Sequence, residues 1–185
     1  MNPPLLGEGP RDRGKSFPST SRLSSGFLMN IADLLAPDAV LPALKAQSKK
    51  QLLQELAARA HGLTRLSERR IFETLVERER LGTTGVGAGI AIPHGRMTEA
   101  KAITGIFARL EHAIDYEAVD SQPVDLVFML LAPENAGADH LKALARVSRL
   151  LRDKSVCEKL RTAKSAEALY AILTADTSGA ASSAA

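Results

Sequence analysis

Aromatic residues are scarce in this chain of 185 residues, which contains no tryptophan, two tyrosines and five phenylalanines. Proteins that bind single-stranded nucleic acid stack the bases on aromatic side chains that alternate with basic ones. The formal net charge is only +3, and part of it comes from basic residues near the N-terminus. The composition therefore gives no support for a nucleic-acid partner, and we expect none.

Cysteine is almost absent, since Cys157 is the only one in the chain. A single thiol excludes an internal disulfide and is compatible with the reducing cytoplasm. Cys157 falls in a helical pattern, which favours a buried and inert thiol over a catalytic one. Long apolar runs are also missing, and none approaches the roughly 20 residues that span a bilayer. We therefore expect a cytoplasmic protein without membrane insertion.

The motifs of several cofactor and metal sites are missing as well. Gly85, Gly87 and Gly89 precede a strand, whereas the dinucleotide fingerprint joins a strand to the helix after it. No Gly-Lys-Ser or Gly-Lys-Thr follows these glycines to make a P-loop of them, and neither His-Glu-x-x-His nor Cys-x-x-Cys is present to bind zinc. We therefore expect neither a cofactor nor a bound metal.

The two ends of the chain differ in composition from the rest. Residues 1–28 are rich in proline, glycine and serine, and they bury too little apolar surface to offset the entropy of ordering, which predicts a disordered leader. Because Met29 follows directly, a mis-assigned start codon explains the leader equally well. Residues 176–185 are small and polar and predict a flexible tail. Residues 29–175 are then expected to form a single folded domain.

Hydrophobic residues recur at helical spacing on both sides of the middle of the chain. Ser48 and Gln51 form a capping-box pattern that predicts a helix, which Gly62 is expected to end. Ser67 is the expected N-cap of a second helix that ends near Gly82. Three more helices are predicted to begin at Asp139, Ser155 and Ser165.

Strands are predicted between these helices. Residues 90–92 form a short apolar stretch that Pro93 is expected to end, because proline lacks the N–H that a β-ladder needs. Residues 82–89 are too rich in glycine for a helix or strand and predict a loop. Residues 103–110 and 124–132 are apolar and bounded by turn residues, which predicts two buried strands in an antiparallel or mixed arrangement. The predicted fold class is an α/β domain.

Histidine is the first residue type to examine for chemistry, because only four are present and the ring titrates near neutral pH. A lone histidine is more often structural or solvated than functional. His61 falls at the end of a predicted helix, where partial negative charge favours the protonated ring, and His112 falls in a polar turn. Neither is assigned a function.

His94 has more unusual surroundings. It follows the short strand and Pro93, and Gly95 comes directly after it, so we expect the ring at a strand end with backbone N–H groups accessible nearby. The glycine-rich residues 82–89 offer further amides to face an anion. A neutral imidazole nitrogen is a competent nucleophile near pH 7, and a phosphorylated one is labile enough to pass the group on. Taken alone, these residues fit an ordinary turn histidine at least as well.

Two more positions are candidates for the same chemistry. His140 follows Asp139, the expected N-cap, in the first turn of a helix, where the free N–H groups and the dipole attract an anion and lower the pKa of the ring. Arg78 and Arg80 fall at the end of the second helix, and a guanidinium binds two phosphoryl oxygens in a planar fork. Their positions alone do not decide the function of His140 or of the two arginines. An exposed histidine at a helix start and solvated arginines on a helix face fit the same pattern.

Together these residues resemble the A component of the bacterial sugar phosphotransferase system, in its mannitol/fructose-type family. The likeness is carried by Glu79, by Val86-Gly87 and by the run Ile90-Ala91-Ile92-Pro93-His94-Gly95. It extends from about Ile31 to Leu173. Within the family it is greatest to the nitrogen-regulatory members, on the stretches 84–89, 120–126, 139–141 and 160–165.

The resemblance implies a fold and a chemistry. The implied fold is a single domain with a mixed β-sheet flanked by α-helices on both sides. His94 would accept a phosphoryl group from the phosphohistidine of a small HPr-like carrier, NPr. His140 would hydrogen-bond this group without being phosphorylated, and Arg78 would help to bind it. The site is expected in a shallow depression with a mildly apolar rim, because a carrier protein must reach it.

The implied function is that of a phosphocarrier whose phosphorylation state is a signal. Adding about −2 charge at one surface position changes which partners the same face binds. The resemblance suggests potassium-transport and nitrogen-related regulators as targets. Two alternatives stay open, namely a pure binding module in which His94 no longer matters and a sugar-specific component that acts in transport.

Overall fold

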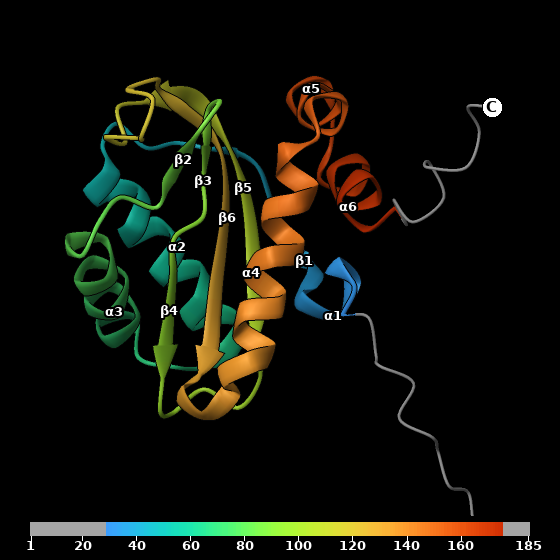
Figure 1. Cartoon of the computed structure of the whole chain (residues 1–185). Helices are drawn as coiled ribbons and strands as arrows, with labels where there is room; N and C mark the ends of the chain where they lie inside the picture. Colours follow the sequence, from blue (N-terminus) through green and yellow to red (C-terminus); the bar gives the residue numbers. More distant parts are fainter. Residues whose placement is uncertain (1–28, 176–185) are drawn as a thin grey trace, which may run out of the picture.

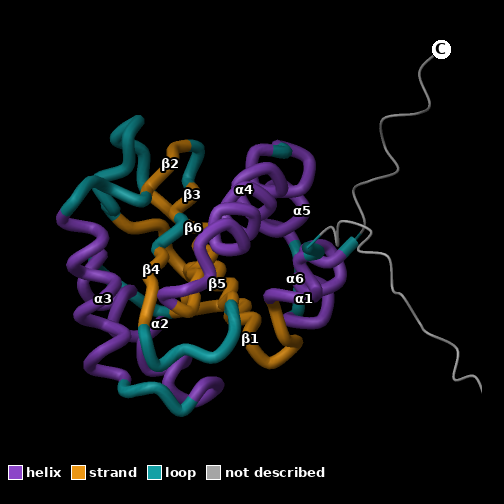
Figure 2. Tube along the Cα trace, turned by 60° about the horizontal axis from the view of Figure 1, so that its bottom comes forward, coloured by secondary structure: helices purple, strands orange, loops and turns teal. Residues whose placement is uncertain are grey.

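The computed structural model describes residues 29–175, and the leader predicted at 1–28 and the tail predicted at 176–185 lie outside the described residues. A six-stranded sheet lies between two groups of helices, with α2 and α3 on one face and α4 on the other (Figures 1 and 2). The strand order is β1-β5-β6-β3-β2, and β4 also pairs with β6. Parallel and antiparallel pairs both occur, so the mixed sheet with helices on both sides is confirmed.

The helices and strands occur in the following order. They are α1 (Ile31–Leu34), β1 (Leu35–Leu44), α2 (Lys49–Thr64), α3 (Glu68–Arg80), β2 (Gly85–Gly87), β3 (Ile90–Ala91), β4 (His94–Met97), β5 (Thr104–Ile114), β6 (Val124–Pro133), the 3₁₀ turn η1 (Glu134–Ala136), α4 (Gly137–Arg152), α5 (Lys154–Thr162) and α6 (Ala166–Thr174). Among the described residues, no helix is both long and apolar enough to span a membrane.

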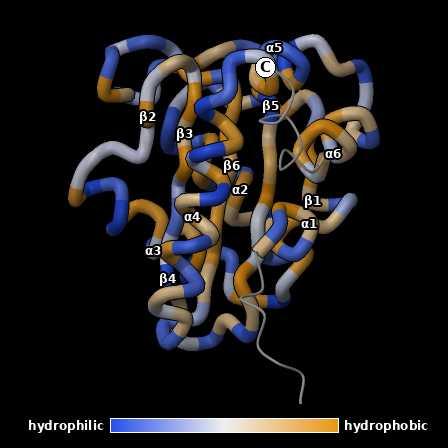
Figure 3. Tube along the Cα trace, turned by 45° about the vertical axis from the view of Figure 1, so that its right-hand side comes forward, coloured by the Kyte–Doolittle hydropathy of each residue, from blue (hydrophilic) through white to orange (hydrophobic). Residues whose placement is uncertain are grey.

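Strands β5 and β6 form the centre of the sheet and pair antiparallel, with Phe107 opposite Phe128. The centroids of these two rings are 6.3 Å apart. Nearly all of β6 is buried, because helices cover both faces of the sheet. Figure 3 shows the hydrophobic residues gathered along these strands and hydrophilic ones in the outer turns. The two buried strands predicted from the sequence are confirmed, and β5 continues four residues further, to Ile114.

Strand β1 is not predicted by the sequence pattern, since Pro37 and Pro42 interrupt it. It nevertheless pairs parallel with β5, at the edge of the sheet. An edge strand tolerates proline because the N–H groups on its outer side need no partner within the sheet. β1 places the following helix, α2, against the face that α3 also covers (Figure 1).

Helix α2 begins where the capping box predicts, since the Ser48 hydroxyl accepts from the N–H of Gln51. The prediction that Gly62 ends this helix is wrong. The helix continues to Thr64, and Arg65 takes the left-handed conformation there, with φ 64° and its N–H bonded to the carbonyl of His61. The hydrophobic contacts of the last turn outweigh the weak helix propensity of a single glycine.

The predicted N-caps of α3 and α6 are confirmed, namely Ser67 and Ser165. Two other predicted starts are wrong. Helix α4 begins at Gly137, before Asp139, because the 3₁₀ turn η1 leads directly into it. Helix α5 takes Asp153 as its N-cap, and this carboxylate accepts from the N–H groups of Ser155 and Val156, so Ser155 lies inside the first turn.

The prediction of a plain loop at residues 82–89 is wrong in part. Residues 85–87 form β2, which pairs antiparallel with β3 as a tight hairpin. Pro93 does not end the ladder either, because β4 continues beyond it and pairs with β6 as β3 does. The proline lacks only a donor: its carbonyl accepts from Leu130 N–H at 3.0 Å. The chain therefore keeps its place beside β6 up to and past His94.

Candidate functional site

His94 is the first residue of β4, and its backbone is held opposite Leu130 of β6, the only strand with which β4 pairs among the described residues. The ring is half-buried, and its Nδ1 lies 2.8 Å from the carbonyl oxygen of Ile92. A carbonyl oxygen only accepts hydrogen bonds, so Nδ1 carries the proton. The strand that precedes Pro93 therefore orients the ring and sets its tautomer.

Arg78 approaches the other ring nitrogen. Its Nε donates to His94 Nε2 at 3.1 Å, and its Nη1 donates to the carbonyl of Gly82 at 3.0 Å. A guanidinium only donates, so Nε2 presents a lone pair. Position on the helix does not distinguish Arg78 from Arg80, whereas the family resemblance points to Arg78. In the structure Arg78 is half-buried against His94, and Arg80 is exposed. His94 is thus a neutral imidazole whose unprotonated nitrogen accepts from a neighbouring cation.

His140 lies next to His94, as the fourth residue of α4. The two ring centroids are 5.7 Å apart, with the ring planes tilted by 49°. His140 is buried, and its Nδ1 has no hydrogen-bond partner among residues 29–175. Buried ring nitrogens in folded proteins are normally paired, so this atom is available to a further acceptor or donor. Asp139, the expected N-cap, instead pairs with Lys142 at 3.2 Å.

We expect both rings to titrate below the ordinary histidine pKa of 6.5. Burial lowers the pKa of His94 most, the Arg78 cation lowers it further, and the bond to Ile92 and the Glu79 carboxylate oppose this. Burial also lowers the pKa of His140, together with the charges of His94 and Arg96. Both rings are then neutral at pH 7, the state in which Nε2 is a nucleophile.

The charge of Arg78 can be tested through this titration. Arg78→Gln removes the cation beside Nε2 and should raise the pKa of His94, measured by NMR titration of the ring protons. Arg80→Gln makes the same change in net charge on an exposed side chain and should leave the pKa of His94 nearly unchanged. Equal shifts in the two variants would contradict a specific contact between Arg78 and His94.

Gly95 is required by packing. A Cβ at this position would lie 2.5 Å from Cγ2 of Thr74, on α3, so glycine lets the helix that carries Arg78 lie close to β4. The sequence predicted that Gly95 leaves backbone amides accessible. In the structure it instead allows α3 to pack closely on β4.

We expect Gly95→Ala to destabilise the protein by about 1–3 kcal/mol, measured by urea unfolding. Serine lacks Cγ2, so the double variant with Thr74→Ser should recover most of this loss; no recovery would contradict the contact.

Glu79 connects the site to the rest of the domain. Its carboxylate is buried and forms an ion pair with Lys49 at 2.8 Å. It also accepts from the backbone N–H of Thr84 at 3.0 Å and from the Thr84 hydroxyl at 2.5 Å. The Tyr116 hydroxyl donates to it at 3.3 Å. The carboxylate thus joins the end of α3, next to Arg78, to the start of α2 and to the segment that leads into the β2–β3 hairpin.

The glycine-rich segment does not serve the site as expected. The N–H of Thr84 bonds to Glu79, that of Gly85 bonds to the Thr83 hydroxyl, and that of Ala88 bonds to Asp120. These amides are therefore occupied by side chains of the protein. Residues 85–89 also do not line the hollow that surrounds His94.

The hollow has a volume of about 920 Å³ and lies between α3, β4 and the start of α4. Leu81 and Leu141 on its edge are 85% and 66% exposed, which gives the rim its apolar character. Arg96 also lines it, and the sequence did not single out this residue. Side chains alternate along a strand, so Arg96 lies on the same face as His94 once 94–97 is seen to be β4.

Solved structures with the same fold include A components of the bacterial phosphotransferase system. A crystal structure of nitrogen regulatory protein IIA-Ntr from Neisseria meningitidis superposes with a TM-score of 0.75 at 40% identity, covering 78% of this chain and 99% of that one. The IIA mannitol structure from Escherichia coli shares the fold at 22% identity, with a TM-score of 0.63, over 75% of this chain and 97% of the other.

The profile of one family, described as "Phosphoenolpyruvate-dependent sugar phosphotransferase system, EIIA 2", matches residues 33–176. The chain belongs to this family. Among its relatives, the "Nitrogen regulatory protein" of Bradyrhizobium diazoefficiens is 61% identical over 145 residues, which are 78% of this chain and 95% of that protein. The protein of the same description from Escherichia coli K12 is 40% identical over 152 residues, 82% of this chain and 93% of its own length.

Proposed function

We propose that this protein is a cytoplasmic phosphocarrier that accepts a phosphoryl group on Nε2 of His94. The observation that carries the proposal is the pair of bonds to this ring: Nδ1 donates to Ile92 O at 2.8 Å, and Nε2 lies 3.1 Å from Arg78 Nε. One nitrogen is held protonated, and the other carries the lone pair, which accepts from Arg78 beside a surface hollow. Arg78 is already in place to bind the phosphoryl oxygens as they arrive.

The donor is a phosphohistidine on a small HPr-like carrier, NPr. Arg78 turns its Nε–H from His94 Nε2 to the arriving phosphoryl oxygens, which frees the lone pair of Nε2. This lone pair attacks phosphorus, the N–P bond of the donor breaks, and its electron pair returns to the donor nitrogen. Nδ1 keeps its proton throughout, because the Ile92 carbonyl stabilises it in both states. The step exchanges one N–P bond for another, so the transfer is readily reversible. The open, apolar rim with Leu81 and Leu141 fits a transient protein partner.

His140 is assigned a supporting role, in which its ring donates a hydrogen bond to a phosphoryl oxygen. The 5.7 Å separation of the two ring centroids leaves this ring within reach of a group bound to His94. We expect His140→Ala to slow transfer by about tenfold, as for the loss of one charge-assisted bond of about 1.4 kcal/mol. Stopped-flow or quenched transfer from phosphorylated NPr measures the rate. An unchanged rate would mean that His140 only packs beside His94.

The phosphorylation state is proposed to act as the signal. A phosphoryl group adds about −2 charge in a hollow lined by three arginines (Arg78, Arg80, Arg96) and two glutamates (Glu77, Glu134), which takes the formal charge of the lining from +1 to about −1. This reverses the local charge, so the same face binds different partners before and after transfer. The relatives described as nitrogen regulatory proteins support nitrogen-related regulators as the targets. Potassium-transport regulators are proposed beside them on the family resemblance of the sequence alone.

The proposal is tested by incubating the protein with phosphorylated NPr and measuring its intact mass. We expect one phosphoryl group per chain, in an acid-labile and alkali-stable linkage. No transfer from phosphorylated NPr would refute the proposed donor. Identical partner binding by the unphosphorylated and phosphorylated protein would refute the proposed signal and favour a pure binding module.

A further inference from the structure

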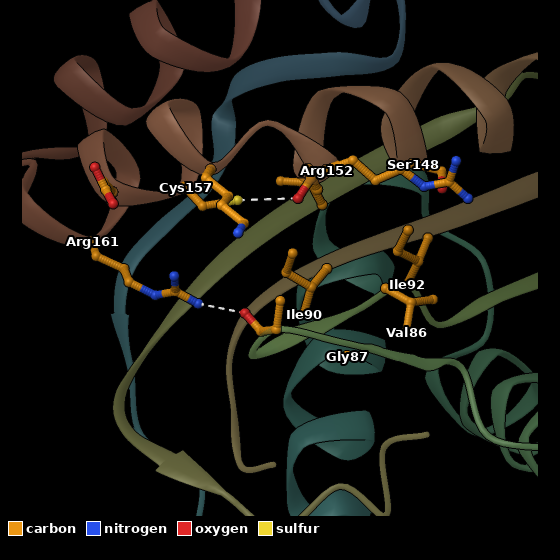
Figure 4. A pocket seen from close by; sticks show the side chains of 12 residues that line it. Val86, Gly87, Ile90, Ile92, Ser148, Arg152, Cys157 and Arg161 are labelled. Carbon is orange, nitrogen blue, oxygen red and sulfur yellow. Dashed lines mark hydrogen bonds between the residues drawn. The ribbon is translucent and has the colours of Figure 1, made fainter. Parts of the chain in front are cut away.

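A second cavity lies apart from the hollow at His94. It has a volume of about 420 Å³ and is bounded by the β2–β3 hairpin on one side and by α4 and α5 on the other. Figure 4 shows Ile90 and Ile92 facing it from the strand side and Cys157 and Arg161 from α5. No residue lines both this cavity and the hollow. A site in this cavity would thus leave the face around His94 free for protein partners.

The inner surface of the cavity is apolar. Ile90, Ile92 and Leu151 line it and are buried, and Val86 stands half-exposed at its mouth. The Cys157 thiol also lines it, but Sγ donates to the carbonyl of Leu151 at 3.1 Å. The interior therefore favours an apolar body over a polar one.

The rim of the cavity is positively charged. Arg161 is already neutralised, because Asp125 accepts from its Nε and Nη2, each at 2.8 Å. Arg152 and Lys154 are exposed and form no ion pair within residues 29–175. They face a single carboxylate of the lining, Glu158. Two cations against one carboxylate leave a net positive charge at the mouth of an apolar cavity.

We propose that this cavity binds a small organic anion with an apolar body. The apolar part would pack on Ile90 and Ile92, and the anionic group would pair with Arg152 and Lys154. The volume is within the range of about 300–1,000 Å³ that small-molecule sites occupy. Arg152 and Lys154 belong to the end of α4 and the start of α5, so an anion between them would join the two helices.

Ile92 connects this cavity to the proposed phosphoryl acceptor. Its side chain lines the cavity, while its carbonyl oxygen accepts from Nδ1 of His94. Its N–H donates to the carbonyl of Thr84 at 2.9 Å, so the residue is held from both sides. An occupant that displaces Ile92 changes the bond that sets the tautomer of His94. We infer that the anion regulates phosphoryl transfer, an inference that rests on the function proposed above.

Binding is tested with anilinonaphthalene sulfonate, an anionic apolar probe whose fluorescence rises in an apolar site. We expect saturable binding of one probe per chain. Ser148→Trp fills the cavity and should weaken binding at least about tenfold. Ala145→Trp adds the same ring on the exposed face of the same helix and should not. Equal binding by the two variants would overturn the proposal, because the probe would then lie elsewhere, for example on Leu81 and Leu141.

The charge requirement is tested without filling the cavity. The double variant Arg152→Gln, Lys154→Gln should weaken probe binding about tenfold. The double variant Arg149→Gln, Lys159→Gln removes the same charge from the same two helices, outside the cavity, and should bind as the wild type does. Equal effects in both pairs, or none in either, would refute recognition of an anion at this rim.

The proposed effect of the bound anion on His94 is measured separately from binding. Saturation with the probe should shift the NMR resonances and the pKa of the His94 ring, and it should change the rate of transfer from phosphorylated NPr. Unchanged His94 resonances at full occupancy would refute the coupling. Failure of the protein to accept phosphate at all would refute the proposed function and leave the binding result standing.

Discussion

Replacing His94 with alanine is expected to abolish phosphorylation by NPr, lowering the transfer rate by at least about a thousandfold. The variant removes the only ring nitrogen that the structure holds deprotonated beside Arg78. Arg78 cannot take its place, because a guanidinium has no lone pair to offer. Intact mass after incubation with phosphorylated NPr measures the result directly.

His112→Ala is the matched control for this experiment, since it removes a histidine that is exposed on β5 and outside the hollow. It should be phosphorylated as fast as the wild type. Labelling of His94→Ala at the wild-type rate would show that another residue accepts the group. Labelling of the double variant His94→Ala, His140→Ala would then exclude His140 as that residue.

Replacing Glu79 with alanine is expected to lower the free energy of unfolding by about 3 kcal/mol. The carboxylate is the shared acceptor of Lys49, Thr84 and Tyr116. Its removal leaves the backbone N–H of Thr84 and the hydroxyl of Tyr116 without this partner in the interior. Urea unfolding checks the value. Phosphoryl transfer should slow as well, because the end of α3 that carries Arg78 loses its attachment.

Glu77→Ala is the control, because Glu77 is exposed on the same turn of α3 and its replacement should change the stability by no more than about 0.5 kcal/mol. Equal effects of the two substitutions would refute the role given to Glu79.

The contribution of Glu79 should also depend on pH. Burial by itself raises the pKa of this carboxyl, but the bonds from Lys49 and Thr84 outweigh burial and hold it below 4.5. A pKa that is lower in the folded than in the unfolded state contributes stability above the unfolded value, and this is lost as the pH falls through the folded value. The stability difference between wild type and Glu79→Gln should therefore shrink below about pH 4.5. A difference that persists there would contradict an ionised Glu79.

The parts of the fold that the sequence predicts are those with local signals. Ser48, Ser67 and Ser165 mark helix starts because a hydroxyl at the N-cap bonds to an N–H three residues ahead, within the same segment. The apolar stretches of β5 and β6 are equally clear, because a strand covered on both faces has no polar side. β1 lacks such a signal, because its two prolines interrupt the strand pattern. A strand that contains them fits only at the edge of the sheet.

The sequence by itself determined the candidate acceptor, His94, and the family to which the chain belongs, because both depend on a contiguous run of residues around Pro93. It pointed to Arg78 only through the resemblance, without a contact to His94, and it gave no role to Arg96 or to the carbonyl of Ile92. Only the tertiary structure decided these, because a tautomer, a pKa and a salt bridge depend on distances between segments that helical or strand periodicity does not specify. Glu79 shows the difference most clearly, since its side chain lies in an alternating run of charges that looks solvated, yet it is buried with three partners from other parts of the chain.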